Sequence, residues 1–285
     1  MSLIMLETSG LWEAAAMKPG RRLVFADRML ISDIDNTLLG ERKALKELMQ
    51  RMKRFRGVAG FGATGRRLES ALQVLEEWSV PMPDVLITAV GTEIYYSPKL
   101  MPDRGWRQHI AYRWQPDQLR EVMDELPGLT LQRESEQREF KLSYDVIDPR
   151  AAPKIADIRR ALSRRGLQAN LVYSHHKHLD LLPIRASKGF ALRYFADKWD
   201  IALDNVLVAG DSGNDVDMLR GRPLAVVVGN HQPELKSLAR LERVYFADGH
   251  CARGILEGMD HYDFFGRCGL AEADADTASE RALAG

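Results

Sequence analysis

The sequence predicts an α/β protein with a mostly parallel sheet that is interrupted by an inserted α+β unit. Apolar strand-like runs alternate with segments of helical periodicity in the first 91 residues and again from about residue 185. Between these two parts the order of elements changes to β-α-β-β-α-β-β, which is typical of a compact α+β unit. A chain of 285 residues, 45% of them hydrophobic, is long and apolar enough for both parts.

The α/β pattern is read from the order of its elements. The first part predicts strands within residues 22–35, 57–66 and 83–91, with helices at 41–55 and 67–80. The pattern resumes with a helix at 187–201, strands within 205–215 and 225–230, and a helix from Gln232. We therefore expect residues 21–91 and 185–268 to form one core.

The middle of the chain, residues 92–184, is expected to form the inserted unit. It begins with a strand at 92–98 and a helix at 115–126 that opens with proline and aspartate. Two strands, a helix at about 152–166 and a strand pair follow. Residues 1–20 are interpreted as an N-terminal extension or a misassigned start, and the Ala- and acid-rich tail, 269–285, is expected to be disordered.

Composition narrows the class of protein. Lys+Arg and Asp+Glu both number 40, and this zero net charge argues against a nucleic-acid-binding or membrane-surface protein. No apolar run approaches the ~18–20 residues that span a membrane. The two cysteines, Cys251 and Cys268, are too few for a disulfide framework. We expect a cytoplasmic protein that binds neither nucleic acid nor membranes.

The stretch LISDIDNTLLG, residues 30–40, places Asp33 and Asp35 at the end of an apolar strand. Two carboxylates this close repel each other, so a cation or a shared proton must compensate. Asp211 and Asp215 follow another strand in the Gly-broken turn GDSGND, and such hard oxygen ligands suit Mg²⁺. Lys188 opens a helix, where its charge could hold a nucleophile and a phosphate together.

A fourth stretch, Thr64-Gly65-Arg66, offers a hydroxyl and backbone N–H groups at a helix start, which suit an anion. Each stretch alone also fits a capped turn or a surface lysine. All four fall at the C-terminal ends of predicted strands or at helix starts, where open α/β sheets bind ligands. Their joint occurrence indicates a site in which Mg²⁺ and a lysine neutralise the clustered carboxylates.

These stretches resemble the four motifs of the haloacid dehalogenase (HAD) superfamily of phosphohydrolases. Segments from about residue 30 to 265, among them GTEI, KLSY and LDLLP, resemble its sucrose-6-phosphate phosphatases. The resemblance implies a Rossmann-like HAD core with an inserted α+β cap domain. It also implies a phosphoric monoester hydrolase that uses Mg²⁺ to convert sucrose 6-phosphate to sucrose and phosphate.

The resemblance assigns roles to individual residues. Asp33 would form an aspartyl-phosphate, and Asp35 would alternate as general acid and base. Phosphate binding would involve Thr64, Gly65, Lys188 and Asn214. Mg²⁺ would be held by Asp33, the backbone carbonyl of Asp35, Asp211 and Asp215.

Sugar recognition is the open part of this prediction. Glu93, Lys141 and Asp180 are candidates to contact sugar hydroxyls, while Lys141 and Asp180 fit solvent-facing strand positions equally well. Mannosylfructose phosphate and glucosylglycerol phosphate are alternative substrates for the same chemistry. A third alternative is a non-catalytic partner module of a sucrose-phosphate synthase. The complete set of acidic and lysine motifs argues against this alternative. An active phosphatase could also dock on that synthase.

Overall fold

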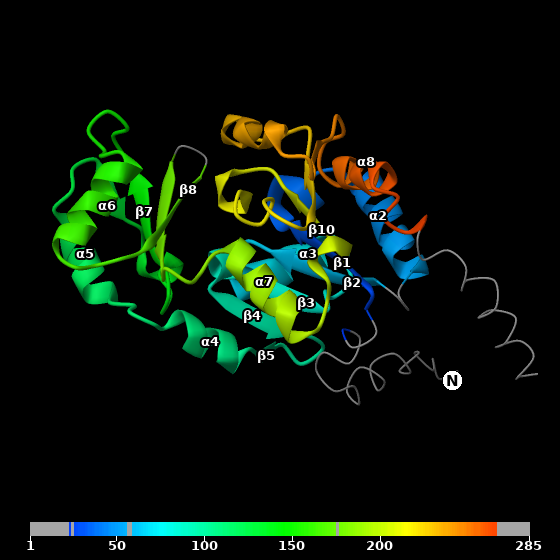
Figure 1. Ribbon diagram of the computed structural model, residues 1–285, viewed down its shortest axis with the longest axis horizontal. Coiled ribbons are helices and arrows are strands. Elements are labelled where there is room, and N and C mark those ends of the chain that lie inside the picture. The colour runs from blue at the N-terminus through cyan, green and yellow to red at the C-terminus, as the bar shows by residue number, and fades with distance from the viewer. Residues whose placement is uncertain (1–22, 24–25, 56–58, 175–176, 267–285) are drawn as a thin grey trace, which may run out of the picture.

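The computed structural model of the protein describes residues 23, 26–55, 59–174 and 177–266. The predicted N-terminal extension and C-terminal tail lie outside the described residues. The chain forms an eight-stranded sheet in the order β12-β11-β10-β1-β2-β3-β4-β5 and a separate four-stranded sheet in the order β6-β7-β9-β8 (Figure 1). The predicted α/β protein with an inserted α+β unit is confirmed.

The large sheet is mostly parallel. Its parallel strands are β1 (Arg28–Asp33), β2 (Ala59–Thr64), β3 (Val85–Thr88), β10 (Val206–Gly210), β11 (Leu224–Val227) and β12 (Val244–Phe246). From β1 the chain first adds β2 and β3 on one side and later adds β10, β11 and β12 on the other. The sheet therefore has its topological switch point between β1 and β10, where open α/β sheets bind ligands beyond the strand ends.

Helices cover both faces of this sheet because β1 is apolar on both faces. Leu30 packs in one core cluster with α2 (Arg42–Arg54), α3 (Leu68–Glu77) and α8 (Ala252–His261). Met29 and Ile31 point the other way, into a cluster with α4 (Arg104–Ile110) and α7 (Lys188–Lys198). Shorter helical turns are Ile34–Leu38, Ala89–Gly91, Glu134–Glu136, Leu203–Asn205, Gly213–Asp215 and Pro233–Arg240.

The small sheet belongs to the inserted unit, which lies at one end of the molecule (Figure 1). Its antiparallel strands are β6 (Leu129–Leu131), β7 (Leu142–Val146), β8 (Asn170–Ser174) and β9 (His178–Leu182). The helices α5 (Pro116–Asp124) and α6 (Ile155–Arg164) pack on the face away from the large sheet and share an apolar core with β7 and β9. The opposite face of the small sheet is turned toward the large one.

One predicted assignment in the insert is wrong. The strand expected at 92–98 is β4 (Glu93–Tyr96), which pairs antiparallel with β3 in the large sheet, and β5 (Met101–Pro102) pairs with β4. The tight turn at Gly91 sends the chain straight back along β3, and Ile94 and Tyr96 bury their side chains in the core. A reading of element order alone does not detect this return because the pairing partner is set by the turn.

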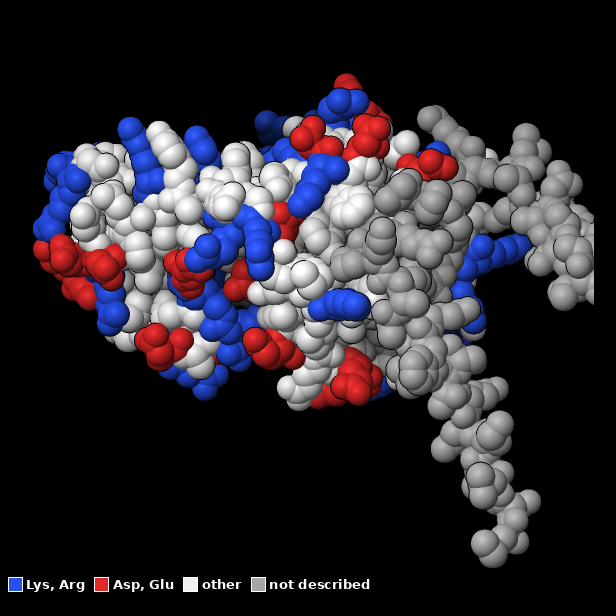
Figure 2. All heavy atoms as spheres, turned by 90° about the horizontal axis from the view of Figure 1, so that it is seen from below, with Lys and Arg blue, Asp and Glu red and all other residues white. Residues whose placement is uncertain are grey.

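No helix among the described residues is long and apolar enough to cross a membrane. On the face shown in Figure 2, basic and acidic side chains are interspersed, in agreement with the zero formal net charge of the sequence.

Candidate active site

The site is built around the end of β1, the central strand at the switch point. Asp33 is the last residue of β1 and its side chain is buried. The strand ends there, and the chain turns through Ile34–Leu38 with Asn36 at φ 56°. In a strand, residues two apart point to the same side, but Asp35 lies in this turn and not in the strand. The carboxylates of Asp33 and Asp35 therefore point to different places, and each has its own cationic partner.

Lys188 is the partner of Asp33. It is the first residue of α7, and Ser187 caps this helix by accepting a hydrogen bond from the Phe190 backbone N–H. The fully buried Lys188 Nζ lies 2.5 Å from Asp33 Oδ1 and 2.6 Å from Asp215 Oδ1. The helix dipole destabilises a positive charge at a helix N-terminus. The ammonium group of Lys188 is therefore stabilised by the carboxylates of Asp33 and Asp215 and not by the helix.

Asp211 and Asp215 reach the site from the turn after β10. Asp215 Oδ2 accepts the backbone N–H groups of Asp211 and Ser212 at 3.0 and 3.1 Å, while its Oδ1 binds Lys188. A Cβ at Gly210 would come within 2.5 Å of the Asp215 Cβ, which explains the glycine. Asp211 Oδ1 accepts the Thr37 hydroxyl at 3.3 Å.

Together these acidic residues form a cluster that fits a divalent cation. Asp33, Asp211 and Asp215 each offer a carboxylate oxygen, and these oxygens lie within 4.8 Å of one another. Asp211 Oδ2 is buried without a hydrogen-bond partner among the described residues. Three carboxylates and one ammonium leave a formal charge of −2 when all are ionised, and buried oxygen ligands of this kind suit Mg²⁺.

The electrostatics of the cluster reflect its burial. Burial, followed by the charges of Asp215 and Asp211, raises the pKa of Asp33 well above its usual value against the opposing effect of Lys188. Burial and the charge of Asp215 raise the pKa of Asp211 to about 7. Burial alone would lower the pKa of Lys188, but the carboxylates of Asp215 and Asp33 outweigh it and raise that pKa. The lysine is thus held as an ammonium while the carboxylates lack full compensation.

Arg66 is the partner of Asp35, and sequence reasoning gave it no role of its own. Its Nε and Nη2 donate to Asp35 Oδ2 and Oδ1, both at 2.7 Å, and its Nη1 donates to Ser70 Oγ at 3.0 Å. The hydrogen bond to Asp35 is the main cause that raises the pKa of Arg66. The Asp35 carboxylate therefore adds no oxygen to the acidic cluster. The signal in the sequence was an arginine directly after Gly65.

The remaining predicted phosphate ligands border the cluster. Thr64 ends β2 in register with Asp33. Gly65 has φ +124°, and a Cβ there would approach Asp33 Oδ1 to 2.9 Å. The Gly65 N–H donates to the Ile87 carbonyl at 3.3 Å. Gly65 therefore belongs to the site because it lies close to Asp33, and its amide is already used within the fold. Asn214 Oδ1 accepts from Lys188 Nζ at 3.0 Å and from the Ser212 hydroxyl.

The predicted sugar contacts lie in two places. Glu93 is in β4 of the large sheet, where it accepts the Thr88 hydroxyl at 2.7 Å. Lys141 and Asp180 are only 6% and 8% exposed, so the alternative of solvent-facing positions is wrong. Lys141 Nζ lies 3.4 Å from Asp180 Oδ1, and the Ser143 hydroxyl donates to the same oxygen at 2.6 Å.

The Lys141 group lies on the side of the insert that faces the core. Along β7, Leu142 and Tyr144 pack against the helices of the insert, so Ser143 points to the opposite face. The edge strand β8, which pairs with β9, rests on the turn of the acidic cluster, where a Cβ at Gly213 would collide with the Tyr173 carbonyl oxygen. The polar group of the insert therefore belongs to the surface that covers the strand ends.

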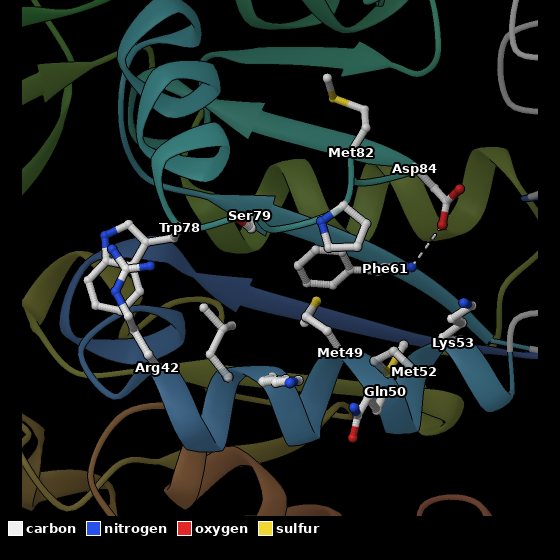
Figure 3. A pocket seen from close by; sticks show the side chains of 13 residues that line it. Arg42, Met49, Gln50, Met52, Lys53, Phe61, Trp78, Ser79, Met82 and Asp84 are labelled. Atoms are coloured by element: carbon white, nitrogen blue, oxygen red, sulfur yellow. Dashed lines mark hydrogen bonds between the residues drawn. The ribbon is translucent and has the colours of Figure 1, made fainter. Parts of the chain in front are cut away.

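A separate apolar pocket of about 510 Å³ lies between α2 and the end of α3 (Figure 3). Met49 of α2, Phe61 of β2 and Trp78 line it. None of its lining residues belongs to the acidic cluster or to the Arg66–Asp35 pair, so its size does not indicate where the chemistry occurs.

Comparison with known proteins relates this site to sugar-phosphate chemistry. The family model of sucrose-6F-phosphate phosphohydrolases matches residues 26–263. A mannosylfructose-phosphate phosphatase of Agrobacterium fabrum is 33% identical over 241 residues, covering 82% of this chain and 96% of that protein. Sucrose-phosphatase 2 of Nicotiana tabacum is 31% identical over 249 residues, covering 82% of this chain and 58% of that protein. The chain thus spans little more than half of the plant enzyme.

The structural comparison agrees. The crystal structure of the sucrose-phosphatase from Synechocystis sp., in complex with sucrose and phosphate, superimposes with a TM-score of 0.78. It is 34% identical in sequence, and the alignment covers 84% of this chain and 98% of that one.

Proposed function

We propose, from the premise that this chain belongs to the sucrose-6F-phosphate phosphohydrolase family and is a phosphatase of the HAD superfamily, that it hydrolyses sucrose 6-phosphate to sucrose and phosphate with Mg²⁺. The observation that supports this most strongly is the buried cluster of Asp33, Asp211 and Asp215 around Lys188 at the switch point of the sheet. A phosphate group is itself negatively charged, so it can bind beside these carboxylates only when cations such as Lys188 and Mg²⁺ are also present.

In the first step Asp33 attacks phosphorus. A bond forms between its carboxylate oxygen and phosphorus while the bond from phosphorus to the sugar oxygen breaks. Asp35 gives its proton to that oxygen, so sucrose leaves neutral. Lys188 holds the attacking carboxylate, which lies 2.5 Å from its Nζ, and Asn214, which binds the same Nζ, orients the phosphate.

In the second step water attacks phosphorus and gives its proton to Asp35. The bond from Asp33 to phosphorus breaks, phosphate leaves, and both aspartates return to their starting states. Mg²⁺, when bound by the acidic cluster, supplies neutralisation of the phosphate charge. Asp215 is fixed by two backbone N–H groups and by Lys188, so it keeps the cluster in place.

The inserted unit is proposed to act as a cap that covers the sugar and excludes water. The group of Lys141, Ser143 and Asp180 suits recognition of hydroxyls because a charged donor and acceptor lie side by side on the face toward the core. Glu93 is a further candidate from the large sheet.

Mannosylfructose phosphate is a second candidate substrate. The relative from Agrobacterium fabrum is matched over 96% of its own length, whereas the plant enzyme is matched over 58%. Both candidates use the same chemistry and differ in the sugar that the inserted unit must recognise. We also propose that the protein acts in the cytoplasm and docks on the synthase that makes its substrate, as the resemblance suggests.

The test is phosphate release with Mg²⁺ from sucrose 6-phosphate, mannosylfructose phosphate, glucosylglycerol phosphate, fructose 6-phosphate and glucose 6-phosphate. We expect kcat/KM for sucrose 6-phosphate to exceed the others by at least about tenfold, a difference that pocket contacts can supply. A higher value for another sugar would change the substrate but not the chemistry. No turnover of any sugar phosphate by folded protein would refute the proposal.

A further inference from the structure

We propose that Arg66 is a positioning residue that fixes the orientation of the Asp35 carboxylate for proton transfer. The inference rests on the proposed phosphatase function and goes beyond the residues assigned above. Arg66 occupies the turn between β2 and α3, and its side chain reaches the turn after β1.

The contact between the two residues is a two-point fork. Nε and Nη2 of Arg66 bind different oxygens of the same carboxylate, both at 2.7 Å. Among the described residues, Arg66 supplies the hydrogen bonds that the structure gives to the Asp35 side chain. A planar guanidinium in this geometry fixes the plane of a carboxylate, which a lysine ammonium cannot do.

Arg66 is itself braced. Its Nη1 donates to Ser70 Oγ, one turn along α3, at 3.0 Å. Its backbone carbonyl accepts the N–H of Ala89 at 3.0 Å, which ties the turn to the chain that follows β3. The fork is thus presented from a rigid support and not from a free side chain.

The same turn meets the inserted unit. Arg67 Nη1 donates to the Ser135 carbonyl at 2.9 Å, and its Nε lies 3.9 Å from a Glu136 carboxylate oxygen. Arg138 Nη2 of the insert lies 3.9 Å from Glu69 Oε2 of α3. The turn that carries Arg66 therefore contacts both the Asp35 side chain and the inserted unit.

This arrangement suits the two tasks of Asp35. A carboxylate has about four lone-pair positions, and the fork uses two of them, so the others stay available to the sugar oxygen and to water. The side chain of Asp35 is 46% exposed, and without the fork it would be free to rotate in solvent. Orientation is what makes a proton transfer group effective, since the acid or base must lie within hydrogen-bond reach of its partner.

The test uses Arg66→Ala and Arg66→Lys in the full chain, with Arg51→Ala as matched control. Arg51 pairs with Asp260 on α8 and contacts none of the site residues described above. Kinetics are measured with the sugar phosphate that the wild type prefers and with p-nitrophenyl phosphate, whose leaving group departs without a proton. Circular dichroism and the thermal shift caused by Mg²⁺ verify that each variant is folded and binds the metal.

General acid–base catalysis contributes about 10²- to 10⁴-fold, and misorientation forfeits part of it, so we expect kcat of Arg66→Ala on the sugar phosphate to fall by about 30-fold. KM should change by less than about threefold, since the fork does not bind substrate. On p-nitrophenyl phosphate the variant should release a burst of one p-nitrophenolate per site, followed by slow turnover, because the aspartyl-phosphate accumulates. Added guanidinium should restore part of the rate to Arg66→Ala, whereas Arg66→Lys should stay impaired.

Three results would overturn the inference. One is a kcat within about threefold of the control on both substrates. The second is a loss confined to KM, which would make Arg66 a substrate ligand. The third is a lower kcat without a burst and without guanidinium rescue. A wild type that hydrolyses p-nitrophenyl phosphate but no sugar phosphate refutes the proposed substrate and leaves the burst test of Arg66 valid. A folded wild type that turns over neither substrate refutes both proposals.

Discussion

Replacing Lys188 by methionine isolates the charge of the lysine from its volume. Both side chains are long and unbranched, so Lys188→Met leaves little empty space. The substitution removes two ion pairs, to Asp33 and to Asp215, from a position with 0% exposure. What remains is a buried group of carboxylates with no ammonium between them.

The magnitude follows from the cost of an unpaired buried charge. Removing one partner of a buried ion pair costs about 3–5 kcal/mol. The raised pKa values of Asp33 and Asp211 let these groups take up protons, which relieves part of the repulsion, so we expect a loss of about 3 kcal/mol near neutral pH. For a chain of 285 residues that corresponds to a fall in Tm of about 5 °C. Activity should fall at least about 100-fold, as when one electrostatic donor is removed from an active site.

The assay is urea unfolding of the metal-free protein, followed by the same measurement with Mg²⁺. Lys43→Met, at an exposed position on α2, is the control and should stay within about 0.5 kcal/mol of the wild type. Mg²⁺ should stabilise the Lys188→Met variant more than the control, because the cation replaces the lost positive charge. A variant as stable as the control without Mg²⁺ would refute the view that Lys188 neutralises the cluster.

Four further predictions concern the carboxylates. Asp33→Asn should abolish turnover without loss of stability, because the pKa of Asp33 already shows that its charge is disfavoured; residual activity above about 1% of wild type contradicts its role as nucleophile. Burial raises the pKa of Asp211 to about 7, so the Kd for Mg²⁺ should rise by about tenfold per pH unit below that value, and a Kd unchanged between about pH 8 and 6 in calorimetry would disprove it. For the same reason the metal-free protein should lose stability as pH rises through about 7. Asp103 caps α4 through the Trp106 N–H and binds Lys198 at 2.7 Å, so Asp103→Ala should cost about 3 kcal/mol in urea unfolding, and a loss below about 1 kcal/mol would show that these contacts are dispensable.

Much of the architecture could be read from periodicity. The apolar runs of β1, β2, β3, β10 and β11 and the helical patterns of α2, α3 and α7 lie where the sequence predicts them. Each is a local property, since burial on one or both faces sets the spacing of apolar residues. The pairing of β4 with β3 was missed because it depends on a turn and a partner strand, and α4 was missed because its seven residues are too short for a clear period.

The chemistry of the site could be predicted from the sequence itself, because its four short polar motifs lie at strand ends or at a helix start, and such positions meet at one edge of a parallel sheet. Only the tertiary structure decided how the charges are divided, with Lys188 held by Asp33 and Asp215 and with Arg66 held by Asp35. It also decided that Lys141 and Asp180 are buried together on the face of the insert toward the core. The physical reason is that ion pairs and burial depend on which distant segments come into contact, and residues 155 positions apart, such as Asp33 and Lys188, share no local signal that could reveal it.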